Sequence, residues 1–439
     1  MTQDSQKPID SPSPKTIVDY IEAIRKNPNE AEAYYNRGVA YGDQKQYDLA
    51  IADFTEAIRI KPDYAEAYYN RAVAYDGKEE YDRAIADFTE AIRIKPDFAD
   101  PYNNRGVLYD NYCEHDLAIA DYTEAIRINP DYANAYHNRG VTYKTKGEYD
   151  LAIADYDEAI RIEPDFAKAY YNRGIAYRRK NEYDLAIVDY NEAIRINPDY
   201  AEAYNNRGIT YDGKEEYDRA IADYTESIRI KPDYAEAYHN RSAAYGYKGE
   251  YDLAIADFTE AIRIKPDYAE AYQWRGVAYR YKGEYDLAIA DFDEAIRIKP
   301  DYANAYNNRG VAYETKGEYD LAIADYNEAI HIEPDHFHAY FNRGDTYDTK
   351  GEYDLAIADF DEAIRIKPDD ADAYYRRGYA YHHKGEYDLA IADYTEAIRI
   401  NPNDAEAYQY RADAYAQKRD DVLAEADRQK VKELTENQT

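Results

Sequence analysis

A proline recurs every 34 residues along this chain of 439 residues. The series comprises Pro28, Pro62, Pro96, Pro130, Pro164, Pro198, Pro232, Pro266, Pro300, Pro334, Pro368 and Pro402. A fixed period in this range is typical of a solenoid, in which each copy is one supersecondary unit that buries its apolar face against its neighbours. The period therefore constrains the fold more than any single motif does.

The same period predicts the organisation of the chain. Residues 1–13 are rich in Pro, Ser and polar groups and are expected to form a disordered leader. Residues 14–30 resemble the second half of one copy, and residues 405–437 a degenerate twelfth copy with a capping helix. Eleven full copies are expected between them, at residues 31–64, 65–98, 99–132, 133–166, 167–200, 201–234, 235–268, 269–302, 303–336, 337–370 and 371–404.

Each copy has the pattern of two helices, as the copy from Ala133 shows. Gly147 marks the end of the first helix, because glycine readily adopts the left-handed conformation. Pro164 ends the second helix, and Asp165 is expected to cap the helix that follows. The stripe predicted to be buried on the first helix is Tyr136, Gly140 and Tyr143. The stripe predicted on the second helix is Ala152, Ile153, Tyr156, Ala159 and Ile160.

These letters and their spacing resemble the tetratricopeptide repeat family. The resemblance is carried, in the copy from Ala133, by Tyr136, Gly140, Tyr143, Ala152, Tyr156, Ala159 and Pro164. It implies an all-α, right-handed solenoid superhelix of tandem helix-turn-helix repeats. It further implies that the outward face of each first helix lines a concave groove that holds partner peptides.

An arginine on the first helix and an aspartate sixteen residues later occur together in every full copy. A pair present in every copy is most simply structural, joining the two helices of the hairpin. We predict the ion pairs Arg37–Asp53, Arg139–Asp155 and Arg275–Asp291, among others of the same spacing.

Composition excludes several classes of function. The formal net charge of -34 repels phosphate backbones, which argues against a nucleic-acid partner. No stretch is apolar and long enough to span a membrane, and the N-terminus lacks a secretory signal. A single cysteine forms no internal disulfide, which suits a reducing compartment. The chain is therefore expected to be cytoplasmic.

No enzymatic motif is present: the sequence has no phosphate-binding glycine loop, zinc spacing or nucleophile elbow, so we predict neither catalysis nor a cofactor. Cys113 replaces the turn glycine and is interpreted as an exposed, inert thiol despite the neighbouring His115. His331, His336 and His338 form a loose cluster whose spacing matches no metal site.

Function is expected where the copies differ. Trp274, the only tryptophan, occupies a position that is asparagine in nine of the twelve copies. It lies on the outward face of its helix, far from the predicted buried stripe. Arg280, Tyr281 and, one copy earlier, Tyr247 are of the residue types that anchor interfaces. We predict a partner-binding groove at these four residues, against the alternative that Trp274 only stacks on the adjacent helix.

A second candidate region is basic. The outward face is acidic in the first three copies, but the fourth and fifth carry Lys144, Lys168, Arg178 and Arg179. This basic island is suited to carboxylates or phosphate of a partner. The alternative is that it only relieves repulsion between like charges within the solenoid.

The pattern as a whole favours a non-enzymatic scaffold that binds an extended peptide or a partner protein in the groove. It is expected to be a monomer. One alternative is a self-assembling structural solenoid whose copies stack end to end. Another is a targeting or adaptor subunit for a separate enzyme. The lysine with which some members of the family grip a C-terminal carboxylate is missing, which argues against that mode of binding.

Overall fold

The computed structural model describes residues 16–436, and these residues form helices α1–α25 with no strand. The fold is therefore an all-α solenoid, as the period predicts. The leader expected at residues 1–13 lies outside the described residues. Contacts divide the chain into an N-terminal unit, residues 1–214, and a C-terminal unit, residues 215–439, with the boundary inside the sixth copy.

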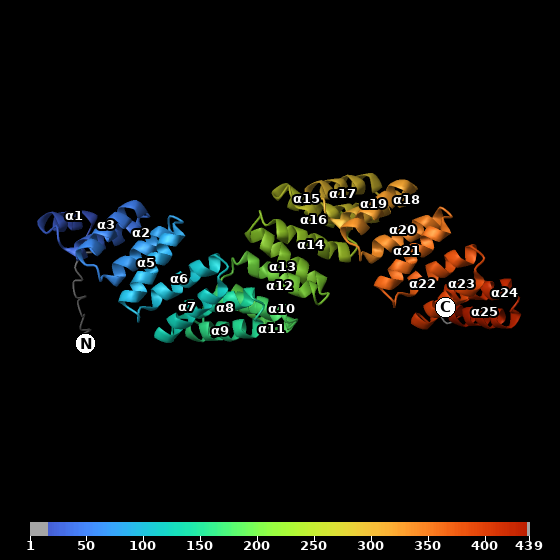
Figure 1. Ribbon diagram of the computed structural model, residues 1–439, viewed down its shortest axis with the longest axis horizontal. Helices are drawn as coiled ribbons and strands as arrows, with labels where there is room; N and C mark the ends of the chain where they lie inside the picture. Colours follow the sequence, from blue (N-terminus) through green and yellow to red (C-terminus); the bar gives the residue numbers. More distant parts are fainter. Residues whose placement is uncertain (1–15, 437–439) are drawn as a thin grey trace, which may run out of the picture. The chain divides into compact units, whose positions relative to one another are not determined.

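Two helices per copy are present throughout the N-terminal unit (Figure 1). The first helices are α2 (Ala31–Asp43), α4 (Ala65–Asp76), α6 (Ala99–Asn111), α8 (Ala133–Thr145), α10 (Ala167–Arg179) and α12 (Ala201–Asp212). The second helices are α3 (Tyr47–Ile60), α5 (Tyr81–Ile94), α7 (His115–Ile128), α9 (Tyr149–Ile162) and α11 (Tyr183–Ile196), and α1 (Ile17–Lys26) precedes them.

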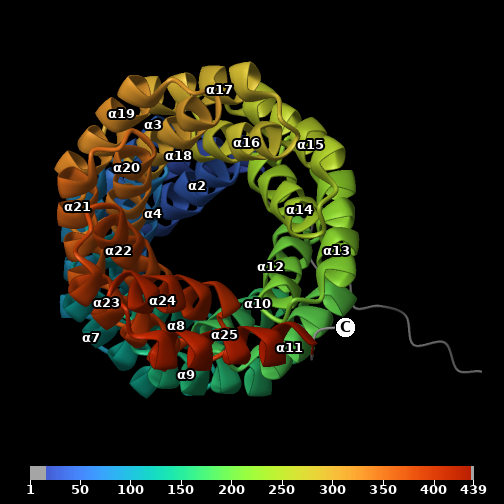
Figure 2. The same ribbon diagram turned by 90° about the vertical axis from the view of Figure 1, so that its right-hand side faces the viewer.

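The C-terminal unit repeats the arrangement. Its first helices are α14 (Ala235–Tyr247), α16 (Ala269–Tyr281), α18 (Ala303–Thr315), α20 (Phe337–Thr349), α22 (Ala371–His383) and α24 (Ala405–Gln417). Its second helices are α13 (Tyr217–Ile230), α15 (Tyr251–Ile264), α17 (Tyr285–Ile298), α19 (Tyr319–Ile332), α21 (Tyr353–Ile366), α23 (Tyr387–Ile400) and α25 (Asp421–Glu436). Within this unit, Figure 2 shows the first helices on the inside of the curve and the second helices on the outside; the first helices are α14, α16, α18, α20, α22 and α24.

The turn inside each copy depends on one residue in the left-handed conformation. In the copy from Ala133 this residue is Gly147, with φ of 80°, and the turn is closed by Glu148 N donating to Tyr143 O at 2.9 Å. Cys113 adopts the same conformation, with φ of 61°, and its side chain is exposed. The turn therefore requires a backbone shape rather than glycine itself, although glycine adopts it at the lowest cost.

The core of each copy is made of alanines around one ring. Ala152, Tyr156 and Ala159 of α9 are buried completely. A Cβ at Gly140 would lie 2.8 Å from the ring of Tyr156, so the small residue allows the two helices to approach closely. The same close approach, with a Cβ 2.6–2.9 Å from the ring sixteen residues later, occurs at Gly38, Gly106, Gly174, Gly276, Gly310 and Gly344. Ala72 and Ser242 stand at this position in two other copies.

The tyrosines of the first helix are less buried than their spacing predicts. Tyr136 and Tyr143 are only half-buried, and their ring centroids lie 5.7 Å and 5.9 Å from the guanidinium carbon of Arg139. A cation held between two aromatic faces is a favourable arrangement. These rings therefore enclose an arginine instead of filling the core.

That arginine connects three helices. Arg139 Nε and Nη2 donate to the two carboxylate oxygens of Asp155 at 2.8 Å and 2.7 Å. Arg139 Nη1 donates to Thr123 Oγ1 of the preceding copy at 2.9 Å. Arg37–Asp53 and Arg275–Asp291 have the same two-bonded geometry, with distances of 2.7–2.8 Å. The ion pair thus joins a hairpin internally, and its third bond joins neighbouring copies.

Helix capping differs from expectation. Asp165 does not cap α10: the N-cap residue is Phe166, which makes no side-chain hydrogen bond. In the last copies the N-cap residue does bond, because His336, Asp370 and Asp404 accept from the backbone N–H three residues later at 3.1 Å. The aromatic packing of the earlier copies is replaced there by polar capping.

We predict that Arg139→Ala destabilises its copy by about 3 kcal/mol, because Asp155, 5% exposed, loses its partner. Burial already raises the pKa of Asp155 against the opposing effect of Arg139. Without the arginine that pKa rises further, so the deficit should shrink as the pH falls and Asp155 is protonated. Denaturant unfolding at neutral and acidic pH measures both effects.

Arg161→Ala is the matched control, since Arg161 pairs with Glu158 on the exposed surface of the same copy. Because Arg161 is exposed, its loss is expected to cost much less stability than the loss of Arg139. Equal costs for the two substitutions would contradict the structural role of the buried pair.

Candidate functional site

The recurring asparagine on the first helix joins adjacent copies. Asn172 Nδ2 lies 3.1 Å from His137 Nε2, and Asn206 Nδ2 donates to Tyr171 Oη at 3.0 Å. The same link is made by Asn70 to Tyr35, Asn104 to Tyr69, Asn138 to Asn103, and Asn342 to Asn307. The asparagine position therefore has a structural role, because its side chain bonds to the preceding copy. Comparison of the copies in sequence did not predict this role.

Trp274 interrupts this series of links. The side chain that an asparagine would reach is His239, and the matching bond of Asn172 goes to Nε2 of His137. The other ring nitrogen of His239, Nδ1, is buried with no hydrogen-bond partner among the described residues. Its ring instead stacks on Tyr268 at 5.1 Å, and burial lowers the pKa of His239 to about 4. Trp274 itself stays 45% exposed. The substitution exchanges a hydrogen bond between copies for an exposed aromatic surface.

A cavity of about 320 Å³ opens on one side of Trp274. Its wall includes Tyr247 and Tyr281, which are 70% and 61% exposed and stack on tyrosines of the preceding second helix at 5.4 Å and 5.3 Å. Its floor includes the buried ring of Phe258. No charged side chain lines it among the described residues. The structure thus brings Trp274, Tyr247 and Tyr281 together around one apolar cavity.

Two small residues on α14 make room for this cavity. Ala243 stands where the eight other copies before the tenth have valine or isoleucine, and Gly246 stands where most copies have a charged or polar side chain. A Cβ at Gly246 would meet nothing within 4 Å. The cavity therefore results from lost side chains as well as from the added indole.

A second cavity, of about 340 Å³, lies on the other side of Trp274 and is polar. Arg280 lines it, with its guanidinium carbon 4.9 Å from the ring centre of Tyr281. Arg280 Nε is buried without a hydrogen-bond partner among the described residues. The other lining residues are Gln273, Trp274, Val277, Tyr281, Tyr302, Asn304 and Asn308, none of them acidic.

The basic island lies on α8 and α10. Lys144 Nζ donates to Asn172 Oδ1 at 2.7 Å, and burial lowers the pKa of Lys144. Lys168 and Arg179 are exposed, whereas Arg178 is half-buried, with Nε lacking a hydrogen-bond partner among the described residues. The four cations have no carboxylate partner among the ion pairs of the described residues.

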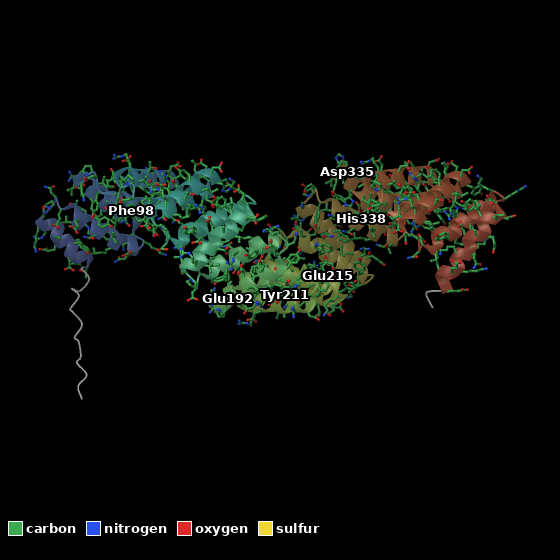
Figure 3. The ribbon with its side chains drawn as sticks, turned by 90° about the horizontal axis from the view of Figure 1, so that it is seen from below. Phe98, Glu192, Tyr211, Glu215, Asp335 and His338 are labelled. Carbon is green, nitrogen blue, oxygen red and sulfur yellow. The ribbon has the colours of Figure 1, made fainter. Side chains whose placement is uncertain are left out.

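The histidines and the cysteine do not form a site. His336 is buried, with Nδ1 accepting from Ala339 N and Nε2 3.2 Å from Asn304 Oδ1, while His338 is exposed (Figure 3). The partner of His115 Nδ1 is Asp110 Oδ1, at 2.8 Å, and not the thiol of Cys113. Within residues 16–436 no group of three or more His, Cys, Asp or Glu side chains could hold a metal ion. None of the helices in that range is both long and apolar enough to cross a membrane.

Two acidic residues lie farther along the groove, and one of them replaces an apolar residue of the repeat. Asp345 occupies the valine position of α20, and burial raises its pKa although Arg376 lies 3.4 Å away. Glu314, one copy earlier, also has a raised pKa because of burial and accepts from Tyr326 Oη at 2.8 Å. This part of the groove carries carboxyl groups that are poorly solvated.

The chain is a helical-repeat protein, a class in which stacked hairpins form an extended concave surface. It has the features of this class: tandem helical hairpins, a core of alanines around one ring in each copy, and side chains that vary on the inner helices. Models described as tetratricopeptide repeat match residues 31–64, 65–98, 167–200, 201–234, 303–336 and 341–405. A model described as TPR repeat matches residues 114–147, 143–180, 244–280 and 276–317. The chain belongs to the tetratricopeptide repeat family.

Several solved structures are similar. The APC/C hetero-tetramer Cut9–Hcn1 is 16% identical, over 91% of this chain and 92% of that chain, with a TM-score of 0.47. YrrB, a TPR protein with an unusual peptide-binding site, is 27% identical over 42% of this chain and 95% of the YrrB chain, with a TM-score of 0.36. MamA is 32% identical over 37% and 94%, with a TM-score of 0.35. No curated protein sequence matches the chain.

Four residues that line the two cavities were not predicted from the sequence. Ala243 and Gly246 are small and carry no functional group, and Gln273 and Tyr302 are of residue types that are common in the repeat. The signal that could have found the first two is the loss of volume at two groove positions of one copy.

We predict that Trp274→Asn changes the stability of the fold by less than about 1 kcal/mol. The introduced asparagine would bond to His239 as Asn172 bonds to His137, and this bond offsets the lost contacts of the indole. Urea unfolding followed by circular dichroism measures the change. A loss of about 3 kcal/mol or more, typical of a buried tryptophan, would show that Trp274 is a core residue.

We predict that Asp345→Val raises stability at neutral pH by about 1 kcal/mol, since a half-buried, poorly solvated carboxylate is replaced by the residue usual at this position. The raised pKa means that the charged form of Asp345 destabilises the folded state, and this penalty disappears as the pH falls. The gain should therefore be smaller in acid. Thermal unfolding across pH tests this, and a gain independent of pH contradicts it.

Proposed function

We propose that this protein is a non-enzymatic scaffold that binds an extended peptide of a partner protein in the groove of its first helices. The observation that carries the proposal is the pair of cavities on the two sides of Trp274, of about 320 and 340 Å³. Both are within the size range of ligand pockets. We call the residues of these two cavities the Trp274 site.

The composition of the Trp274 site supports a peptide ligand. Exposed Trp and Tyr side chains with a neighbouring Arg are the residue types that supply most binding energy at interfaces. Trp274, Tyr247 and Tyr281 are exposed although the repeat could place smaller polar groups at these positions. Tyr247 and Tyr281 are also held by stacking on Tyr217 and Tyr251, which limits the side-chain entropy lost when a ligand binds.

The basic island is a second proposed contact. Lys144, Lys168, Arg178 and Arg179 have no carboxylate partner within residues 16–436, on a chain whose net charge is -34. Carboxylates of a partner would accept hydrogen bonds from these donors, above all from Arg178, because its buried Nε has no partner in the described part of the chain. An acidic segment of a partner is the ligand that this surface favours.

A display selection of random peptides tests the proposal. The wild-type chain should enrich peptides, and part of them should lose at least about tenfold in affinity on Trp274→Asn, the size expected for a hot-spot residue. Another part should lose affinity when Lys168, Arg178 and Arg179 are all changed to glutamate. Fluorescence of Trp274, the only tryptophan, reports binding at the first site directly.

Circular dichroism and light scattering provide the controls, since both variants must remain folded and in the same oligomeric state as the wild type. If no enriched peptide is weakened by either variant, both proposed contacts are wrong. An increase in particle size with concentration would favour the self-assembling alternative over a monomeric scaffold.

A further inference from the structure

We infer that the Trp274 site recognises a short peptide segment with a bulky apolar side chain and a nearby carboxylate. The apolar side chain enters the cavity on the α14 side of the indole, and the carboxylate binds Arg280 on the other side. This inference rests on the proposed function and assigns the chemistry of the ligand at that site.

The first half of the inference comes from the lining of the apolar cavity. Phe258, Ala254 and Ala278 are buried and form its deeper part, and Trp274 and Tyr281 form its rim. A volume of about 320 Å³ lies at the lower end of the size range of ligand pockets and is large enough for one bulky side chain. Because none of the described residues that line the cavity carries a charge, an apolar side chain is favoured there over a charged one.

The second half comes from Arg280. Its guanidinium lies against the ring of Tyr281, is half-buried, and leaves Nε without a partner among the described residues. The polar cavity around it contains amides and hydroxyls but no carboxylate, although acids outnumber bases 89 to 55 in the chain. A carboxylate can accept two parallel hydrogen bonds from a guanidinium, and this geometry is stronger where water is partly excluded.

Both cavities share Trp274, Val277 and Tyr281, so they adjoin across one indole. In an extended peptide, alternate side chains point the same way and lie about 7 Å apart. One short segment can therefore place its apolar side chain in one cavity and its acidic side chain in the other. The first helices around the site lie on the inside of the curve of this unit (Figure 2).

The position of Gly246 offers a variant that should fold at least as well as the wild type. Gly246→Arg introduces the residue that α10 and α16 carry at the same helix position, Arg178 and Arg280. It meets no atom within 4 Å of its Cβ, and arginine favours a helix over glycine. Its side chain would occupy the apolar cavity. The matched control is Gly42→Arg, the same change at the equivalent, equally open position of α2.

The test is a display selection of random peptides on the wild type, Gly246→Arg, Gly42→Arg and Arg280→Gln. The wild type should enrich peptides in which a bulky apolar residue stands close to Asp or Glu. Gly246→Arg should lose the apolar preference, Arg280→Gln should lose the acidic preference and keep the apolar one, and Gly42→Arg should match the wild type.

A double-mutant cycle then measures the contact. In an enriched peptide, replacing the acid by its amide should weaken binding to the wild type about tenfold, and binding to Arg280→Gln less than twofold. Enriched peptides that lack the apolar–acidic pattern, or whose preferences are the same on all four proteins, would overturn the inference while leaving the scaffold proposal standing. An empty wild-type selection would overturn both.

Discussion

The structure depends above all on one arginine per copy. Arg139 holds both carboxylate oxygens of Asp155, lies between two tyrosine rings, and donates its remaining bond to Thr123 of the preceding copy. Such a group fixes the angle between the helices of a hairpin and the register between hairpins at the same time. Because these bonds hold the two helices of a hairpin and the neighbouring hairpin in place, the side chains on the inner face of the first helix can vary without loss of the fold.

The Trp274 site shows how that freedom is used. Its copy keeps the pair Arg275–Asp291 and the close approach of Gly276 to the ring of Phe292. What changes is confined to the groove: an asparagine link is lost, a valine position is reduced to Ala243, and a charged position is reduced to Gly246. Binding surface is thus created by removing contacts between copies as much as by adding aromatic groups.

Much of this could be predicted from the sequence, because identical letters at a fixed period carry the same physical meaning in every copy. The two-helix unit, the left-handed turn at Gly147 and the Arg–Asp spacing all follow from that argument. The hydrogen bond between the asparagine and the preceding copy could not be predicted in this way. It joins two residues 35 positions apart, and the residue that the asparagine contacts is tyrosine, histidine or asparagine in different copies. Tyr136 and Tyr143 were misplaced in the core because helical spacing gives a face but not the depth of burial, which here depends on the arginine between them.

The third bond of the arginine has a consequence for how such a chain can change over generations. Each copy is tied to its predecessor through contacts at constant offsets, and the copies are close to interchangeable in sequence. Recombination between misaligned copies of the gene would therefore add or delete whole 34-residue units while every remaining junction kept its bonds. The Trp274 site is built from residues of three successive copies. A recombination event outside these copies would leave the site intact and change only its distance along the array from other surfaces.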